Sequence, residues 1–435
     1  MPTFQTVRGM RDLLGEEAQI FTGIISKSRE TARLYGYREV ITPVVESFDL
    51  LSAKSGEEIR QRMFIFKDMG DRKVALRPEF TASIARLTTT ALKNEPKPLR
   101  LFSAGSVYRY DEPQKGRYRE FYQSNFELMG SNRPEADAEI VLLTDSLVKS
   151  VGLRDYAFKI GNVGVVRGIL TEEGVDEKTQ NEILQLMDKK NYEEAFKLVT
   201  TQKCREILEG LLQLKSTDCF ETIENLKSYV ARNERAKAAA ENLGDILKLV
   251  VESGCPVKEV EPAFARGLEY YTGMIFEVYI PELDIALGGG GRYDRLIELF
   301  GGEHTPAVGV AHGIDRIALA LEAQKTLIGA EFGKRVLVFA VCDALKIEAL
   351  KIAQQLRQSG FVVEFDVMGR KVAKALEDAD KRKVGYAVIV GERELKDGNV
   401  MLRNLVKREQ AVVPIKGLAE KIATSSSKGV ESIYQ

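Results

Sequence analysis

Residues 101–130 (LFSAGSVYRYDEPQKGRYREFYQSNFELMG) constrain the fold more than any other stretch of this chain. Two runs of alternating polar and apolar residues flank a loop that contains Pro113 and Gly116, a pattern typical of a β-hairpin. Four basic residues lie in or beside this loop: Arg109, Lys115, Arg117 and Arg119. One interpretation is an exposed hairpin with a solvated charged tip, and the other is a hairpin that holds phosphate.

The second run of the hairpin has two chemically different faces, because successive residues of a strand point in opposite directions. We expect one face to carry Tyr122, Ser124, Phe126 and Leu128, and the other to carry Phe121, Gln123, Asn125 and Glu127. Gln123 and Glu127 therefore share a face, where they can act on the same ligand.

Length and composition limit the kind of protein. The 435 residues exceed one ordinary core and predict two or three domains of roughly 100–200 residues each. No apolar run approaches the roughly 20 residues of a membrane helix, and the first residues lack the pattern of a signal peptide. We therefore expect a cytoplasmic protein without a membrane segment.

Few side chains are available for metal or nucleophilic chemistry. Two histidines, His304 and His312, exclude a multi-histidine metal site and argue against a Ser-His-Asp hydrolase. The cysteines form no C-x-x-C pair, so we expect free buried thiols at Cys204, Cys219, Cys255 and Cys342. The chemistry should depend on arginines and carboxylates.

Two segments of the first 330 residues have a clear periodicity. Apolar spacing predicts a helix over residues 16–35 that Gly36 ends, then a strand over residues 37–41 before Pro43. Residues 171–254 are charged, rich in leucine and almost free of proline, which predicts a helical insertion.

A glycine-rich run follows the strand-like residues 285–287, at Gly288 to Gly291. No G-x-x-x-x-G-K-[ST] occurs, and no G-x-G-x-x-G joins a strand to a helix, so P-loop and Rossmann sites are excluded. We expect these glycines to let backbone pack under a substrate. A helix should follow near Asp315 and Arg316, with Ile314, Ile317, Ala318 and Leu321 on one face.

The last hundred residues form a separate pattern. The order strand, helix, strand, helix, strand predicts a parallel-containing α/β domain over residues 335–341, 344–359, 361–365, 372–381 and 386–390. Residues 399–405 and 410–414 should form an edge hairpin, and residues 424–427 a frayed tail. Residues 331–435 hold 19 Lys and Arg against 14 Asp and Glu, an excess compatible with nucleic acid.

Motifs at seven separated places resemble, in the right order, those of class II aminoacyl-tRNA synthetases. Pro43 resembles class motif 1, Tyr108-Arg109 with its loop resembles motif 2, and residues 309–316 resemble motif 3. Residues 8–12 (RGMRD) and 77–81 (RPEFT) are similar to the histidyl-tRNA synthetase family. Residues 266–271 (RGLEYY) and 289–294 (GGGRYD) resemble the signature peptides of that family.

The resemblance implies an α+β class II catalytic domain, an antiparallel sheet flanked by helices, with a helical insertion and a C-terminal α/β anticodon-binding domain. The implied boundaries are residues 1–170 and 255–325 for the catalytic domain, 171–254 for the insertion and 331–420 for the anticodon-binding domain. It also implies ATP-dependent activation of L-histidine and its transfer to tRNA(His).

Two other functions are compatible with parts of the sequence. A non-catalytic paralogue resembling the regulatory subunit of ATP phosphoribosyltransferase typically lacks the C-terminal domain and loses active-site arginines. This chain keeps Arg109, Arg266 and Arg316, which favours the ligase. An ATP-dependent ester- or amide-forming enzyme without tRNA is disfavoured by the basic C-terminal domain.

Adenylate formation concentrates negative charge around the α-phosphate, which fixed arginines can stabilise. By resemblance, Arg109 and Arg266 are catalytic, and the ATP-binding arginines are Arg109, Arg117 and Arg316. A carboxylate that accepts a ring N–H suits imidazole recognition. The histidine-binding residues that the resemblance implies are Glu79, Thr81, Arg109, Gln123, Glu127, Arg266, Tyr270, Tyr271 and Tyr293.

The resemblance implies ATP with Mg²⁺ as co-substrate, no prosthetic group and no metal site made by protein alone. Its implied partners are tRNA(His), L-histidine and a second copy of the chain, since motif 1 belongs to a homodimer. We expect tRNA contacts at Gln114, Arg370, Lys371 and Lys374.

Overall fold

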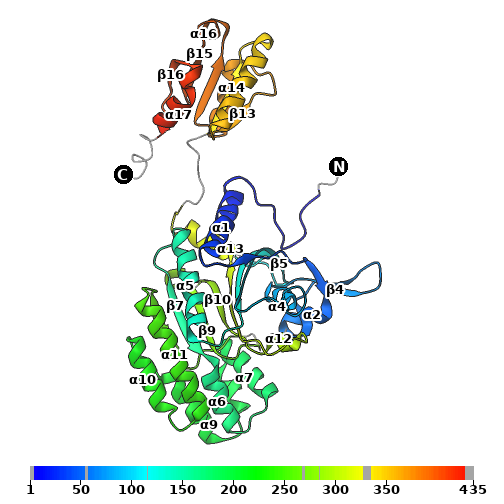
Figure 1. Cartoon of the computed structure of the whole chain (residues 1–435), viewed down its shortest axis with the longest axis vertical. Coiled ribbons are helices and arrows are strands. Elements are labelled where there is room, and N and C mark those ends of the chain that lie inside the picture. Colours follow the sequence, from blue (N-terminus) through cyan, green and yellow to red (C-terminus); the bar gives the residue numbers. More distant parts are fainter. Residues whose placement is uncertain are drawn as a thin grey trace. The chain divides into compact units, whose positions relative to one another are not determined.

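The computed structural model describes residues 4–53, 57–114, 116–266, 270–283, 285–326 and 335–426. The chain divides into two compact units, Met1–Gly329 and Ala330–Gln435 (Figure 1). Lys115 and residues 267–269 of the first signature peptide lie outside the described residues. The division of the first unit into a catalytic domain and an insertion stays a prediction.

An eight-stranded sheet forms the centre of the first unit, within the described residues. Neighbouring strands are antiparallel except at the two ends, where β1 pairs with β5 and β7 pairs with β8 in parallel. In spatial order the strands are β1 (Arg38–Glu39), β5 (Leu99–Tyr108), β6 (Glu120–Met129), β11 (Ala307–Gly313), β10 (Ile285–Arg292), β9 (Met274–Ile280), β7 (Ala157–Asn162) and β8 (Val257–Val260). The predicted antiparallel sheet is confirmed, with the edge pairs making it mixed.

Helices cover the apolar face of this sheet. The main ones are α1 (Gly15–Leu34), α5 (Pro134–Ser150) and α13 (Ile314–Ala323). Phe126 and Leu128 of β6 lie in the same hydrophobic cluster as Phe21 of α1 and Ile317 of α13. Acidic residues in the first turn of α1 and Arg33 in its last suit the helix dipole. Gly36, with φ of 75°, follows the helix, as predicted.

The predicted helical segment contains five helices within the described residues: α7 (Glu177–Asp188), α8 (Tyr192–Lys197), α9 (Gln202–Gln213), α10 (Cys219–Tyr229) and α11 (Glu234–Glu252). Most begin at an Asp, Asn or Thr whose side chain accepts a backbone N–H, as Asp176 does for α7 and Asn233 for α11. They gather with α6 (Val163–Glu172) beside β7 and β9 (Figure 1), and α11 packs on α5 and α6. None of the described helices combines the length and apolarity needed to cross a membrane.

The first unit also contains a second, smaller sheet. Its three strands are antiparallel, in the order β2 (Val45–Ser47), β4 (Lys73–Leu76) and β3 (Ile65–Lys67). The short helices of this region are α2 (Phe48–Ala53), α3 (Glu57–Gln61), α4 (Thr81–Thr89) and α12 (Leu296–Leu299). The predicted strand over residues 37–41 is reduced to β1, and the last ladder bond at this edge is that of the Val40 N–H to the Phe102 carbonyl at 2.8 Å.

The four glycines lie inside a central strand rather than in a loop. They belong to β10, which pairs with β9 on one side and β11 on the other. A Cβ at Gly290 would strike the carbonyl oxygen of Gly309 on the neighbouring strand. The prediction placed a strand only at residues 285–287, because runs of glycine usually mark turns, whereas here they permit close packing.

The second unit has a five-stranded sheet with strand order β13 (Val362–Phe365), β12 (Arg335–Ala340), β14 (Tyr386–Val390), β15 (Asn399–Asn404) and β16 (Glu409–Pro414). The first three strands are parallel and the last two form the antiparallel edge hairpin, as predicted. The connecting helices are α14 (Lys346–Gln358), α15 (Val372–Lys381) and α16 (Glu392–Lys396).

The predicted frayed tail is wrong over its described part. Residues 424–426 belong to α17 (Leu418–Ser426), and Ser427 lies outside the described residues. The helix forms because Leu418 and Ile422, one turn apart, are buried in the core of the second unit. Serine-rich composition alone suggested an end of structure.

The cysteines are free, as predicted, but they are not all buried. Cys204 and Cys255 are buried, whereas Cys219 and Cys342 are partly exposed. Burial raises the pKa of the Cys204 thiol to about 11, so this thiol stays protonated at neutral pH.

A buried histidine predicts how stability depends on pH. The His312 ring has its Nε2 3.0 Å from the Thr144 hydroxyl, and burial lowers its pKa to about 3. The unfolded chain binds a proton near pH 6.5 and the folded chain does not, so the free energy of unfolding should fall as the pH drops. The expected loss from this residue is about 1.4 kcal/mol per pH unit between about pH 6 and pH 4.

Urea denaturation of the wild type and His312→Gln between pH 4 and pH 7 measures this effect. The variant should be less stable at pH 7, because a buried ring is lost, and its stability should depend less on pH. Equal slopes for the wild type and His312→Gln would contradict the assignment.

Candidate active site

A cavity of about 470 Å³ opens on the polar face of the large sheet. All the residues that the sequence suggested for histidine and ATP line it: Glu79, Thr81, Arg109, Arg117, Gln123, Glu127, Arg266, Tyr270, Tyr271, Tyr293 and Arg316. Gln114 lies at the tip of the hairpin loop, outside this lining. Arg370, Lys371 and Lys374 belong to the second unit.

The hairpin explains why one face of β6 meets the cavity. In the register of β5 and β6, Gly105 lies opposite Gln123 and Leu101 lies opposite Glu127. Gln123 and Glu127 line the cavity, while Phe126 and Leu128 point into the core beneath. The predicted assignment of these residues to opposite faces of β6 is therefore confirmed.

A buried carboxylate lies at the inner end of the cavity. Glu127 is 1% exposed and accepts a hydrogen bond from the Thr81 hydroxyl at 2.7 Å and another from the Tyr293 hydroxyl. Its carboxylate occupies the space that a Cβ at Gly309 would fill. Burial raises the pKa of Tyr293, and the adjacent Glu127 carboxylate raises it further, so the phenol remains a donor.

Other polar groups at this end are held rigidly. Glu79 accepts from the backbone N–H groups of Thr81 at 2.8 Å and Ala82 at 3.1 Å, at the start of α4. The Tyr270 ring lies 4.9 Å from Tyr271 and 5.7 Å from Tyr293, measured between centroids. Burial raises the pKa of Tyr271 to about 12. This end of the cavity is therefore lined by protonated hydroxyl groups and by carboxylates, which suits a ligand with N–H donors.

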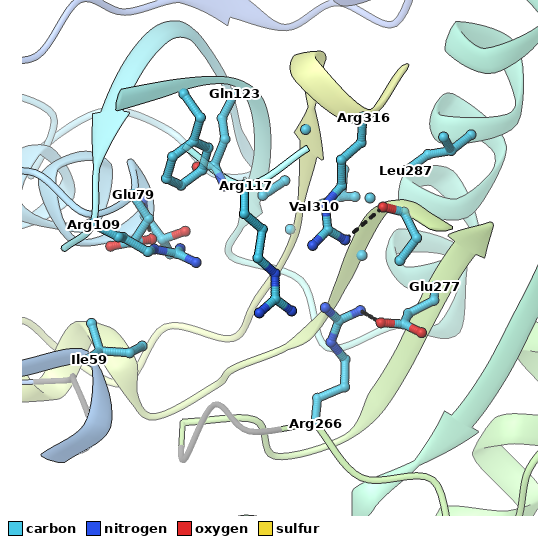
Figure 2. A pocket seen from close by; sticks show the side chains of 18 of the residues that line it. Ile59, Glu79, Arg109, Arg117, Gln123, Arg266, Glu277, Leu287, Val310 and Arg316 are labelled. Carbon is cyan, nitrogen blue, oxygen red and sulfur yellow. Dashed lines mark hydrogen bonds and ion pairs between the residues drawn. The ribbon is translucent and has the colours of Figure 1, made fainter. Parts of the chain in front are cut away.

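Arginines form the opposite part of the wall. Figure 2 shows Arg117, Arg266 and Arg316 reaching toward one another from three separate segments. Arg266 pairs with Glu277 at 3.0 Å (Figure 2), and it donates to the Phe276 carbonyl at 3.1 Å. Its guanidinium lies where a Cβ at Gly289 would be, so the glycine strand makes this approach possible.

These guanidinium groups are held by carbonyl oxygens as well as by charge. Arg316 donates to the Ala286 carbonyl at 2.9 Å, and Arg109 donates to the Pro78 carbonyl at 3.0 Å. Burial lowers the pKa of Arg316, and the nearby Arg117 lowers it further. Positive charges that repel one another in a partly buried site are stabilised when a polyanion binds.

Several residues of the cavity were not found from the sequence. Glu277 on β9 is one, and the register of β9 with β10, which places it opposite Gly289, was needed to find it. Gln185, Asp188 and Lys189 come from the end of α7, so the helical segment contributes to the wall. No motif in that segment signals this role.

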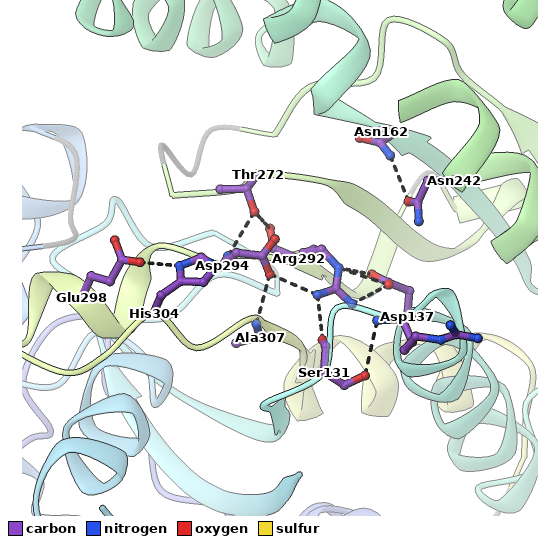
Figure 3. Close-up of polar contacts among 11 residues, drawn as sticks. Ser131, Asp137, Asn162, Asn242, Thr272, Arg292, Asp294, Glu298, His304 and Ala307 are labelled. Carbon is purple, nitrogen blue, oxygen red and sulfur yellow. Dashed lines mark hydrogen bonds and ion pairs between the residues drawn. The ribbon is translucent and has the colours of Figure 1, made fainter. Parts of the chain in front are cut away.

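The second signature peptide is held by a buried ion pair. Arg292 is 6% exposed and its Nε donates to Asp137 of α5 at 3.0 Å, while its Nη1 donates to the Ser131 carbonyl at 2.9 Å (Figure 3). Asp294 accepts from Arg292 and from the Ala307 backbone N–H at 3.1 Å. These bonds hold the end of β10 and the adjacent Tyr293 in place.

Three features together define the core of a class II aminoacyl-tRNA synthetase. The central sheet is mainly antiparallel, Arg109 follows its hairpin strand β5, and Arg316 lies in the first turn of α13, which follows β11. The cavity lies between the two arginines. Two family models agree with this fold. Histidyl-tRNA synthetase matches residues 9–317, and Anticodon binding domain matches residues 335–425. The chain belongs to the histidyl-tRNA synthetase family.

Similar proteins support the same family. Histidine–tRNA ligase of Methanococcus maripaludis strain C7 is 41% identical over 423 residues, which cover 96% of this chain and 99% of that protein. The crystal structure of histidyl-tRNA synthetase from Nostoc sp. PCC 7120 has the same fold, with a TM-score of 0.82 at 23% identity over 98% of this chain and 100% of that one.

A third similar protein carries a double description. The Bacillus halodurans structure described as an ATP phosphoribosyltransferase regulatory subunit/histidyl-tRNA synthetase is 28% identical, with a TM-score of 0.75 over 87% of this chain and 97% of that one. Its description names both the ligase and the regulatory subunit, so the residues of the cavity must separate the two functions for this chain.

The buried pair between Asp137 and Arg292 predicts a large effect on stability. Asp137→Asn removes the buried counter-charge of Arg292, which then keeps only its pair with the partly exposed Asp294, and should lower the free energy of unfolding by about 3 kcal/mol. Urea denaturation at neutral pH measures the loss. Glu135→Gln, which removes an exposed carboxylate from the same helix, is the matched control and should leave the midpoint almost unchanged. Similar midpoints for the two variants would argue against the role given to Asp137.

Proposed function

We propose that this chain activates L-histidine with ATP and transfers the histidyl group to tRNA(His). The observation that carries this proposal is the pairing, in one cavity, of convergent arginines with a buried carboxylate and its hydroxyl partners. The first set suits a triphosphate and the second suits an imidazole. Near-complete coverage of a histidine–tRNA ligase at 41% identity supports the same function.

The roles of the arginines follow from the charge that develops during adenylate formation. A carboxylate oxygen of histidine attacks the α-phosphorus of ATP, the bond to the β-phosphate oxygen breaks, and pyrophosphate leaves. Arg109 would bridge the substrate carboxylate and the α-phosphate, and Arg266 would stabilise charge on the α-phosphate. Arg117 and Arg316 would bind the outer phosphates. In the second step the 3′-hydroxyl of the terminal ribose attacks the histidyl carbonyl and AMP leaves.

The inner end of the cavity would bind the amino acid. Glu127 accepts a ring N–H of the substrate, assisted by Tyr271, and Tyr270 and Tyr293 enclose the ring. The α-amino group would lie against Glu79, Thr81 and Gln123. Because Glu127 is already fixed by hydroxyl donors, it is aligned before the substrate binds.

Mg²⁺ would enter with ATP. Among the described residues, no group of three or more His, Cys, Asp or Glu side chains could hold a metal ion. The phosphate oxygens of ATP would therefore provide the main ligands, and the ion would neutralise charge on the leaving pyrophosphate.

Each predicted domain would have its own role in the reaction. Residues 1–170 with 255–325 would form the catalytic domain, 171–254 the insertion and 331–420 the anticodon-binding domain. Gln114 at the hairpin tip would contact the acceptor end of tRNA. Arg370, Lys371 and Lys374, around the start of α15, would contact the anticodon, after Arg370 exchanges its ion pair with Asp366 for phosphate. We propose a homodimer on the motif 1 resemblance, and a cytoplasmic location on the family to which the chain belongs.

The regulatory alternative is the weaker one on physical grounds. A regulatory subunit needs no arginine beside an α-phosphate, yet Arg266 has both a glycine that makes room for it and a carboxylate that orients it. Arg109 and Arg316 are likewise retained and line the cavity.

Histidine-dependent ATP–pyrophosphate exchange tests the proposed reaction directly. The wild type should exchange with histidine, and Arg266→Ala should lose about a hundredfold or more in kcat because the α-phosphate loses a fixed cation. Arg154→Ala, at a residue outside the cavity lining, is the control and should exchange normally. The absence of exchange with histidine in the wild type, or full exchange in Arg266→Ala, would overturn the mechanism.

Glu127→Gln tests the recognition of imidazole. The amide keeps the size of the side chain but replaces a carboxylate oxygen with an N–H₂ donor, which opposes a ring N–H. The KM for histidine should rise by about a hundredfold or more, with a much smaller change in the KM for ATP. An equal rise in both constants would show that Glu127 acts on the fold of the cavity rather than on histidine.

A further inference from the structure

The segment at residues 8–11 packs against the loop of the β5–β6 hairpin. The backbone N–H of Arg119 donates to the Gly9 carbonyl at 2.8 Å. The backbone carbonyl of Arg119 accepts from the Arg109 N–H at 2.9 Å. The Arg119 side chain occupies the space that a Cβ at Gly9 would fill. A stretch near the start of the chain is thus joined to the loop that carries Arg117.

The Arg11 guanidinium makes the most extensive contacts of this segment. It lies 3.8 Å from the centroid of the Tyr118 ring, and Tyr118 directly follows Arg117 in the chain. Its Nη2 atom pairs with Asp315 Oδ1 at 2.7 Å, and its Nη1 atom pairs with Glu17 Oε1 at 3.2 Å. Stacking on an aromatic ring combined with two ion pairs uses the planar geometry of arginine.

Asp315 connects this contact to the other side of the cavity. It is 4% exposed and lies in the first turn of α13, immediately before Arg316. Its second oxygen accepts from the backbone N–H of Tyr122 on β6 at 2.7 Å. Arg11 therefore joins Tyr118, which follows Arg117, to Asp315, which precedes Arg316. All four of these neighbours line the cavity.

Arg117 and Arg316 need such support because they repel each other. The pKa of Arg316 is lowered by burial and then by Arg117, so the two guanidinium groups would separate if the surrounding backbone allowed it. Holding them in position before the ligand arrives lowers the reorganisation that binding requires.

We propose that Arg11 is a positioning residue for the triphosphate of ATP. It acts through Tyr118 on the hairpin loop and through Asp315 on the start of α13, and thereby sets the separation of Arg117 and Arg316. This inference rests on the proposed function, since it assigns ATP to that part of the cavity. It extends that function to a residue outside the cavity lining.

The contacts of Arg11 predict a selective kinetic effect. Arg11→Ala should raise the KM for ATP in pyrophosphate exchange by about tenfold or more, because the buried Asp315 loses its ion-pair partner and the loop loses its stacking contact. The KM for histidine should change by less than about twofold, since Thr81, Glu127 and Tyr293 are held by one another. A merely structural defect would lower the amount of active enzyme and leave both KM values unchanged.

Conservative variants separate the two contacts. Arg11→Lys keeps a positive charge near Asp315 but cannot stack as a plane on Tyr118, so its KM for ATP should lie between those of the wild type and Arg11→Ala. Tyr118→Leu removes the stacking partner alone. In the double variant Arg11→Ala/Tyr118→Leu, the fold-increase in the KM for ATP should be smaller than the product of the two single increases, because both substitutions disrupt the same contact.

Arg8→Ala is the matched control. Arg8 belongs to the same segment and pairs with Glu112 of the same loop at 2.9 Å, but both side chains are more than 70% exposed. Its removal should leave the KM for ATP within about twofold of the wild type. Thermal unfolding of each variant identifies loss of fold, and if Arg11→Ala does not fold, Arg11→Lys and Tyr118→Leu provide the test.

Two results would overturn the positioning role while leaving the proposed function intact. One is normal exchange with an unchanged KM for ATP in folded Arg11→Ala, or in both Arg11→Lys and Tyr118→Leu if Arg11→Ala does not fold. The other is an equal rise in KM for ATP and histidine. Failure of the wild type to exchange would instead refute the proposed function, and calorimetric binding of a non-hydrolysable ATP analogue to the wild type and these variants would still test the positioning role.

Discussion

The close approach of charged side chains to the backbone of β10 and β11 is the constraint on which this site depends. Arg266 lies against Gly289 and Glu127 lies against Gly309, so two opposite charges rest directly on neighbouring strands. Any side chain at either glycine would displace the group that rests there. The sheet therefore serves as a flat support whose open positions determine where each charged group can lie.

Much of this arrangement could be predicted from local patterns. Alternation in residues 121–128 correctly divided β6 between core and cavity, because strand geometry has a fixed period of two. The motif positions brought Arg109, Arg117, Arg266 and Arg316 into one cavity. The order of elements in the second unit was equally readable, since each buried strand and amphipathic helix has its own periodicity.

The remaining features depend on contacts between distant residues. Glu277 becomes important only when β9 pairs with β10, and Asp137 only when α5 covers the end of that strand. The end of α7 reaches the cavity through tertiary packing that no periodicity encodes. The full length of the glycine-rich strand β10 was not predicted for a related reason. Only the strands and side chains packed against it make glycine favourable there.

The helical segment has a consequence for how the molecule could be divided. Its helices share one hydrophobic cluster with the large sheet, and α7 supplies Gln185, Asp188 and Lys189 to the cavity wall. Removing the segment would expose apolar surface and open the cavity on one side at the same time. The segment is therefore tied to the cavity as closely as to the core, and a change of length near the end of α7 would alter both.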